Sequence, residues 1–191
     1  MIMENFENDF SNSLKVLNAG DIILYPTDTI WGIGCDATNS TAVQKIFELK
    51  KRDEKKSMII LVTDENMINK YVSNPSEKIL TLISKAEKPT TAIFKNAAHL
   101  PSNLVNEDGS IAIRIVKDEF CRQLIEQLKK PLVSTSANIS GEKFPQNFNE
   151  ISKEIKNGVD YIVQHRQNDF SKKAPSSIIK LNDQDEIEVI R

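Results

Sequence analysis

The chain has 191 residues, of which 39% are hydrophobic and 27% are charged. This composition is ordinary for a globular protein whose core is large enough to need no disulfide or metal staple. The net charge of −2 and the isoelectric point of about 5.8 argue against bulk electrostatic binding to nucleic acid. A local basic cleft stays open as an alternative, because the net charge averages over the whole surface.

Helices and strands are expected to alternate in the first half of the chain. The spacing of hydrophobic residues predicts a helix over 6–18 and a second helix that Asn39 or Ser40 can cap. Apolar runs at 22–25 and 58–62 predict strands. Lys50 falls near the C-terminus of the second helix, at the edge of its buried face, and Arg52 lies just past it.

The second half continues the same alternation. The run 111–115 alternates between apolar isoleucines and other residues, so Arg114 is expected on the face opposite the three isoleucines. No repeat and no Pro-, Gly- or Ser-rich linker divides the chain, which predicts one α/β domain over 1–191 with an open sheet. The other expected elements are helices over 77–86 and 119–129, strands over 91–94, 132–134, 161–163, 178–181 and 187–190, a turn at 106–110 and a loop at 141–149.

No targeting, membrane or metal-binding segment is recognised. The N-terminal residues 1–6 are neither basic nor followed by an apolar run, and no stretch is long enough to span a membrane. We therefore expect a cytoplasmic protein without a membrane partner. The two cysteines, Cys35 and Cys121, are too few for a disulfide framework or a zinc site. Cys35 lacks an obvious histidine partner and is expected to be a small buried hydrophobe.

Two cations and a polar cluster form the first candidate site. Lys50 and Arg52, with the hydroxyls and amide of Ser134, Ser136 and Asn138, suit a polyanion such as a nucleoside triphosphate. No Walker-type glycine loop is present, so side chains would hold the phosphates. On spacing alone, a solvated charged helix end is the commoner explanation of the two cations. A capped strand-to-loop turn likewise accounts for the polar cluster.

The turn after the first strand and one arginine form the second candidate site. Thr27 and Thr29 flank Asp28, and they could bind a small polar substrate or belong to a plain turn plugged by Trp31. Arg114 lies inside an apolar strand, where burial is costly without a partner. Its partner is expected to be an internal carboxylate or that of a substrate. Together these segments predict an enzyme that activates a small molecule with ATP.

Taken together, the chain resembles the YrdC-like family, the threonylcarbamoyl-AMP synthases that begin the modification of an adenosine beside the tRNA anticodon. It looks like the short, single-domain bacterial form. The order and separation of the matching segments cover nearly the whole chain. These segments are Tyr25–Ala37, Lys50–Arg52, Ile111–Arg114, Ser134–Gly141 and Ala174–Ile179.

The resemblance implies a twisted, mixed α/β sheet with flanking helices and a large concave cleft. It implies a nucleotidyltransferase of tRNA processing that converts L-threonine, bicarbonate and ATP to threonylcarbamoyl-AMP and pyrophosphate, with Mg²⁺ accompanying the phosphates. The implied catalytic residues are Lys50 and Arg52, on the triphosphate and the carbonate-derived group. The residues implied around threonine are Thr27, Arg114, Ser134 and Ser176, with Arg114 pairing the threonine carboxylate. The further nucleotide contacts are Ser110, Ser136, Asn138 and Arg191.

The chain departs from the family pattern at three places. Leu61 replaces a histidine seen in longer members, Asp53 replaces a proline after the basic motif, and segment 87–92 replaces a Trp-Pro-Gly-Pro-x-Thr run. Two other functions stay open: an RNA-binding module without catalysis, and a related carbamoyl-transfer domain of hydrogenase maturation. tRNA and a downstream threonylcarbamoyl transferase are the partners that the resemblance suggests.

Overall fold

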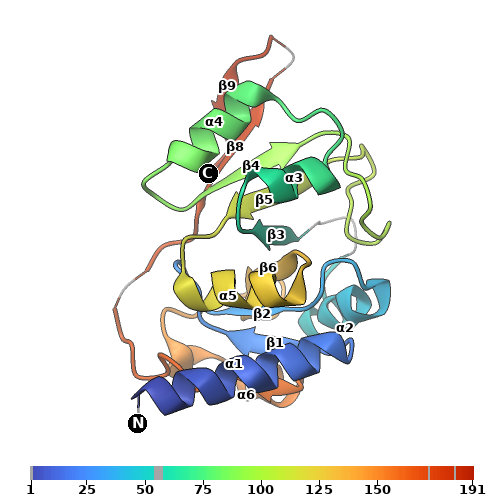
Figure 1. The fold of residues 1–191 in the computed structure, drawn as a ribbon. Coiled ribbons are helices and arrows are strands. Elements are labelled where there is room, and N and C mark those ends of the chain that lie inside the picture. The colour runs from blue at the N-terminus through green and yellow to red at the C-terminus, as the bar shows by residue number, and fades with distance from the viewer. Residues whose placement is uncertain (1, 54–57, 172, 183) are drawn as a thin grey trace.

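A mixed β-sheet runs through the molecule, and we describe it from a computed structural model that covers residues 2–53, 58–171, 173–182 and 184–191. Within these residues the sheet has nine strands in the order β7-β1-β2-β6-β3-β5-β4-β8-β9 (Figure 1). The strands are β1 (Ile23–Tyr25), β2 (Gly32–Gly34), β3 (Ile59–Val62), β4 (Thr90–Phe94), β5 (Ile111–Ile115), β6 (Leu132–Ser136), β7 (Tyr161–Ile162), β8 (Ser177–Leu181) and β9 (Ile187–Val189). The helices are α1 (Ile2–Asn18), α2 (Ser40–Lys50), α3 (Glu65–Tyr71), α4 (Glu77–Lys85), α5 (Glu119–Leu128) and α6 (Lys153–Asn157), with a 3₁₀ turn η1 (Phe148–Glu150).

Strand β6 joins the two halves of the sheet. Its first residues pair antiparallel with β3, and its last two residues pair antiparallel with β2. Parallel pairs join β1 to β7, β3 to β5 and β4 to β8, and the remaining neighbours are antiparallel. The predicted mixed α/β sheet is therefore confirmed. Three segments meet over the middle of this sheet, where the candidate site lies. They are the end of β6, the residues just before β8, and the turn between β1 and β2.

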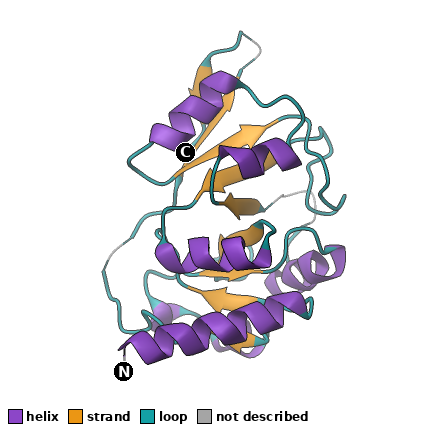
Figure 2. Ribbon diagram, viewed as in Figure 1, coloured by secondary structure: helices purple, strands orange, loops and turns teal. Residues whose placement is uncertain are grey.

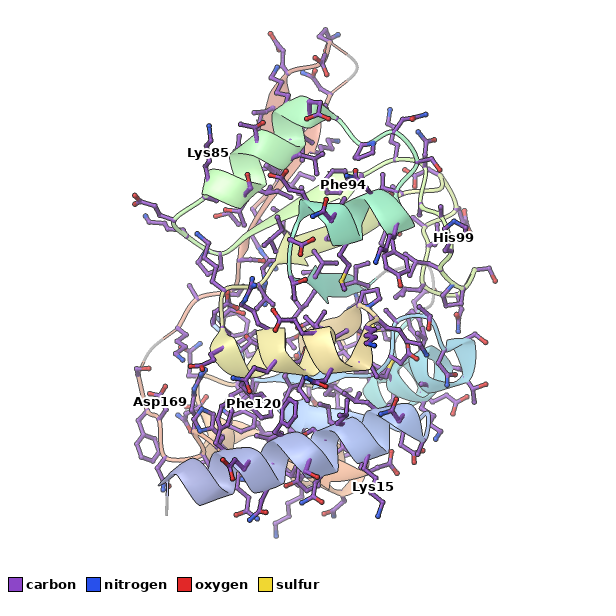
Figure 3. The ribbon with its side chains drawn as sticks, viewed as in Figure 1. Lys15, Lys85, Phe94, His99, Phe120 and Asp169 are labelled. Carbon is purple, nitrogen blue, oxygen red and sulfur yellow. The ribbon has the colours of Figure 1, made fainter. Side chains whose placement is uncertain are left out.

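Helices α3, α4 and α5 pack on one face of the sheet. Figure 2 shows α3, α4 and α5 lying in front of the strands in the chosen view, and residues of α4 contact β4 and β5 while those of α3 and α5 contact β3. Helix α1 packs against α5, where the rings of Phe6 and Phe120 meet edge to face at 5.4 Å. Phe120 points from α5 toward α1 (Figure 3). No helix in the described part of the chain has the length and apolarity to cross a membrane.

Capping side chains define several helix ends, and the expected cap of α2 is one of them. Asn39 accepts a hydrogen bond from the backbone N–H of Ala42 and so begins α2, and Asp118 does the same for α5 through Cys121. At the C-terminus of α2, Lys51 adopts a left-handed conformation with φ of 50°. This left-handed residue ends α2 and turns the chain at Lys50–Arg52, which fixes where both cations can reach.

The structure adds three elements that the sequence patterns do not predict. Strand β2 has only three residues, two of them glycines, so it carries no β-propensity signal. Helices α3 and α6 have seven and five residues, too short for a clear helical period. Helix α1 also begins at Ile2 rather than at residue 6. The remaining predicted helices and strands are confirmed within a few residues of their expected ends.

Candidate functional site

A cavity of about 300 Å³ is lined by residues from both halves of the sheet. Strand alternation builds it: Ala112 and Arg114 of β5 line the cavity, while Ile111 and Ile113 between them belong to the hydrophobic core. The predicted orientation of Arg114, away from the isoleucines, is therefore confirmed. The other lining residues are Thr29, Ile30, Trp31, Gly32, Arg52, Met58, Ile59, Ile93, Ser134, Thr135, Ser136, Phe144, Pro175, Ser176, Ile178 and Arg191.

Three guanidinium groups give the cavity a positive field. Arg52 follows helix α2, Arg114 lies on β5 and Arg191 is the last residue of the chain. Burial lowers the pKa of Arg52, and burial together with the nearby Arg114 lowers the pKa of Arg191. An arginine keeps its charge despite such shifts. No aspartate or glutamate is among the described residues that line the cavity, and the carboxylate of Asp28, which is not one of them, pairs with Arg114.

Arg114 has an internal carboxylate partner. Its Nη2 lies 3.2 Å from Asp28 Oδ1, and its Nη1 donates a hydrogen bond of 3.2 Å to Thr29 Oγ1. Of the two alternatives left open by the sequence, the partner is therefore an internal aspartate. Thr29 lines the cavity, whereas Thr27 lies behind it with its Oγ1 2.9 Å from that of Thr29. The turn between β1 and β2 thus holds the guanidinium from behind.

Hydroxyl groups from two segments face the same cavity. Ser134 and Ser136 alternate along β6 and both line it. Ser176 arrives on the long connection between β7 and β8, which runs up one side of the molecule in Figure 1. The Ser176 hydroxyl lies 2.7 Å from Thr91 Oγ1. The Arg191 guanidinium donates to the Ser176 carbonyl at 3.2 and 3.1 Å, which ties the end of the chain to this wall.

Lys50 lies behind the cavity wall. It is 1% exposed, and its Nζ donates to the carbonyl oxygens of Ser136 and Asn138, the latter at 2.6 Å. Burial and the nearby Arg52 lower the pKa of Lys50 to about 7. Asn138 is also occupied internally, since its Nδ2 donates to the carbonyls of Ile139 and Glu142.

The structure brings together six of the ten predicted site residues and separates four from the cavity. The six that line the cavity are Arg52, Arg114, Ser134, Ser136, Ser176 and Arg191. Thr27, Lys50 and Asn138 are occupied by the hydrogen bonds just described. Ser110 is 3% exposed and completes the turn before β5, where Asn106 Nδ2 donates to its hydroxyl at 2.9 Å. The roles predicted for these four residues stay predictions, and none of the four lines the cavity.

Sequence reasoning missed several residues of the cavity. The sequence offers Thr29 as a possible substrate contact, but the resemblance gives it no role, although it contacts Arg114 and lines the cavity. Phe144 belongs to a loop whose composition carries no signal for a binding wall, and Pro175 lies in the matching segment Ala174–Ile179 but receives no role there. Only the polar motif around Thr29 could have been extended from the sequence, because apolar loop residues carry no recognisable spacing.

The described residues contain no group of three or more His, Cys, Asp or Glu side chains that could hold a metal ion. Both cysteines are fully buried, which confirms the expectation for Cys35. Burial, as the main cause, raises the pKa of both thiols. The cavity therefore suits binding and orientation of an anionic substrate more than attack by a protein nucleophile.

Comparison with known proteins agrees with this geometry. A profile of the Sua5_yciO_yrdC family, described as "Telomere recombination", matches residues 15–191. A protein of Methanocaldococcus jannaschii is 38% identical over 171 residues, which are 88% of this chain and 78% of that protein. A Pseudoalteromonas translucida protein named "Threonylcarbamoyl-AMP synthase" is 29% identical over 160 residues, 82% of this chain and 86% of that protein.

Among solved structures, that of P. abyssi Sua5 complexed with L-threonine is similar in fold. Its TM-score is 0.84 at 21% identity, and the match covers 95% of this chain and 53% of that one. The chain therefore spans about half the length of that solved relative.

Proposed function

The chain belongs to the Sua5/YciO/YrdC family, and from this premise we propose that it is an L-threonylcarbamoyladenylate synthase. It would convert L-threonine, bicarbonate and ATP to threonylcarbamoyl-AMP, pyrophosphate and water, the first step of threonylcarbamoyladenosine formation in tRNA. The observation that carries the proposal is the cavity lined by three arginines and several hydroxyls, with no carboxylate side chain among the described lining residues. Relatives named as threonylcarbamoyl-AMP synthases supply the chemistry.

The reaction needs binding and charge neutralisation more than a protein nucleophile. The threonine amine forms an N–C bond with the bicarbonate carbon, and a C–O bond breaks to release water. An oxygen of the resulting carbamate attacks the α-phosphorus, and the bond to the β-phosphate breaks so that its electron pair leaves with pyrophosphate. A cavity that holds the short-lived carbamate beside ATP would speed this attack by proximity. Arginines around the phosphates would stabilise the charge that develops on the leaving group.

We assign the lining residues to two groups, following the resemblance to the family. Arg52, Ser136 and Arg191 are assigned to the nucleotide phosphates, because a planar guanidinium can bind phosphate oxygens through two hydrogen bonds. Arg114, Ser134 and Ser176 are assigned to threonine, with Arg114 facing its carboxylate. Asp28 occupies one edge of the Arg114 guanidinium, and an arginine has five N–H donors, so further donors stay available to a second carboxylate.

ATP is a substrate in this proposal, and Mg²⁺ would enter with it. The described residues of the cavity offer hydroxyls and guanidiniums but no carboxylate side chain, and protein-bound Mg²⁺ is usually held through one or two carboxylates. These described residues therefore do not fit a resident Mg²⁺ ion. Triphosphate oxygens and water would be its ligands.

The RNA-binding module without catalysis is not favoured. Net charge is −2, and curated relatives that span most of this chain bear the name of a synthase. tRNA and a downstream threonylcarbamoyl transferase are proposed as later partners of the product, because the adenylate must be passed on to an acceptor. The carbamoyl-transfer alternative differs in its substrate and can be tested beside the main proposal.

The deciding experiment measures pyrophosphate release from ATP by the purified protein, with threonine and bicarbonate added together or singly. Release that requires both, with threonylcarbamoyl-AMP found by mass spectrometry, is the expected result. Release with carbamoyl phosphate in place of both would favour the carbamoyl-transfer reading. Absence of release in every mixture would overturn the synthase assignment.

Arg52→Ala should lower kcat/KM for ATP at least about 100-fold, the scale seen when a donor to developing charge is removed. The fold should persist, since Arg52 lies beyond the end of α2 at the cavity wall. Circular dichroism and thermal unfolding provide the control. A folded variant with full activity would exclude Arg52 from the phosphate site.

A further inference from the structure

We propose that Thr91 is a positioning residue of the substrate site. Its buried hydroxyl donates to Ser176 Oγ, fixes that side chain, and directs the Ser176 hydroxyl proton into the cavity toward the carboxylate of the bound amino acid. The identity of this ligand rests on the proposed function. The hydroxyl pair itself belongs to the fold and can be tested without any ligand.

The Thr91 hydroxyl lies just behind the wall of the cavity. Thr91 on β4 is 0% exposed and does not line the cavity, whereas Ser176 does. The two hydroxyl oxygens are 2.7 Å apart, a normal length for a hydrogen bond between hydroxyl groups. The backbone also brings them together, because the N–H of Ser177 donates to Pro89 O at 3.0 Å where β8 begins to pair with β4. Thr91 therefore reaches the site through Ser176.

Burial sets the direction of this hydrogen bond. Among the described residues, the Ser176 hydroxyl is the one hydrogen-bond partner of Thr91 Oγ1. A buried hydroxyl proton without an acceptor is costly, so Thr91 is the donor. The Ser176 hydroxyl accepts this bond, and its own proton stays available to a ligand in the cavity that Ser176 lines. The pair thus makes Ser176 a donor toward the ligand.

The charges around Ser176 indicate which ligand group its proton meets. Arg191 donates to the Ser176 carbonyl at 3.2 and 3.1 Å, and burial together with the nearby Arg114 lowers the pKa of Arg191. Arg114 also lies directly opposite Thr91 in the β4–β5 ladder, so their side chains leave the sheet on the same face. A group bound here meets guanidiniums and a hydroxyl proton, which suits an anion. In the proposed reaction this anion is the amino acid carboxylate that Arg114 faces.

Two substitutions separate the hydroxyl from the rest of Thr91. Thr91→Val keeps the branched shape, which a strand accepts readily, and removes the donor. Thr91→Ser keeps the donor. Thr90→Val is the matched control on the same strand, because the Thr90 hydroxyl donates to Lys88 O at 3.0 Å and Thr90 does not line the cavity. Thermal unfolding checks that each variant is folded.

The first measurement is the NMR coupling between the α- and β-protons of Ser176 in the full chain without ligand, which reports its χ1 rotamer. We expect one rotamer in the wild type, in Thr91→Ser and in Thr90→Val, and rotamer-averaged couplings in Thr91→Val. An unchanged single rotamer in Thr91→Val would overturn the proposal, because Thr91 would then not fix Ser176. Averaged couplings already in the wild type would do the same.

The second measurement is the binding of L-threonine and of L-threoninamide, which lacks the carboxylate. The fluorescence of Trp31 reports it, because Trp31 is the single tryptophan of the chain and lines the cavity. Thr91→Val should weaken L-threonine binding about 10-fold, since a hydrogen bond to a charged group is lost. Binding of L-threoninamide should change less than about threefold, and Thr91→Ser should bind L-threonine within about threefold of the wild type.

Three binding results would overturn the role of Thr91. They are full L-threonine affinity in folded Thr91→Val, an equal loss for L-threonine and L-threoninamide, and a loss of ATP affinity in place of L-threonine affinity. Failure of the proposed function gives a different result. A wild-type protein that binds no L-threonine contradicts the synthase, while the Ser176 couplings still decide whether Thr91 fixes that side chain.

Discussion

Arg114 carries its charge into a largely buried position, and Asp28 makes this tolerable. The two side chains are 4% and 17% exposed and approach to 3.2 Å. An arginine in such a place costs several kcal/mol unless a partner compensates it. Thr29 adds a neutral acceptor on the other side of the guanidinium. The pair therefore explains how a cation can stand in an apolar strand and still face a substrate cavity.

Removing the Asp28 charge should expose the cost of burying Arg114. We expect Asp28→Asn to lower the free energy of unfolding by about 2 kcal/mol, below the range for fully buried pairs because Asp28 retains some solvent contact. Urea unfolding of the wild type and of Asp28→Asn measures this decrease in the free energy of unfolding. In a double-mutant cycle, Arg114→Met should make Asp28→Asn nearly neutral, since no unpaired cation remains. Equal costs of Asp28→Asn with and without Arg114 would show that the two charges are not coupled.

The sequence predicts individual site residues well where one local signal is enough. Arg114 follows from strand alternation, and Ser134 and Ser136 follow from a strand that ends in a polar cluster. The hydrogen-bond partners of Lys50 cannot be predicted in this way. Its helix position predicts a side chain at the edge of a buried face, but the carbonyls that occupy it come from a segment 86 residues away. Only the assembled sheet brings these groups together.

At the scale of elements, β2 is the least predictable part of the site and one of the most constrained. Gly34 lies opposite Ile23 of β1, and a Cβ added there would approach Val133 O to 2.5 Å and Tyr25 Cε1 to 2.6 Å. The Tyr25 hydroxyl also donates to Val133 O at 3.1 Å. A glycine here leaves room for the tyrosine ring to reach across to β6.

Gly34→Ala should therefore destabilise the protein by about 3 kcal/mol, because neither the carbonyl nor the packed ring can withdraw easily. Gly32→Ala is the matched control on the same strand, where the nearest atom would lie at 3.3 Å, and it should cost less than about 1 kcal/mol. Chemical unfolding of both variants provides the comparison. Similar costs at the two positions would mean that β2 adjusts as a whole and that the close contact is not limiting.

Strands and helices can be predicted where the hydrophobic pattern is long, and the prediction fails where the pattern is short. Strand β3 is a mostly buried apolar run, β5 alternates isoleucines with Ala112 and Arg114, and the sequence predicts both. Helix α3, with seven residues, and strand β2, with three, fall below the length at which a period is visible. Because β2 lies between β1 and β6, missing it hides how the Thr27–Trp31 turn comes to face Ser134 and Ser136.

At the scale of the whole molecule, strand order is what builds the cavity and is what the sequence does not reveal. β6 is sixth along the chain but pairs between β2 and β3, so distant motifs meet at one place. Parallel and antiparallel pairs alternate in no simple pattern. Local secondary-structure propensity does not determine the order or direction of the strands, because these depend on which faces can be buried together. The fold class could be predicted, but the sheet order could not.

The free energy of unfolding of the whole protein should depend on pH through the titration of Lys50. Burial and Arg52 lower its pKa to about 7 in the folded protein, whereas an unfolded lysine titrates near 10.4. Between these values the unfolded chain binds more protons than the folded one, so this group makes stability rise with pH. Below about pH 7 both states are protonated, the slope vanishes and the burial penalty is fully present.

We therefore expect the difference in unfolding free energy, wild type minus Lys50→Met, to be flat from pH 6 to 7. It should increase by about 1 to 2 kcal/mol from pH 7 to 8.5. Subtracting the variant removes the contributions of other groups, such as His165, whose pKa is lowered mainly by burial. Wild type minus Lys51→Met should show no such rise, because Lys51 is exposed and Glu154 raises its pKa. A flat difference for Lys50→Met would mean that the two carbonyls and local water keep the Lys50 ammonium charged throughout, in spite of its burial.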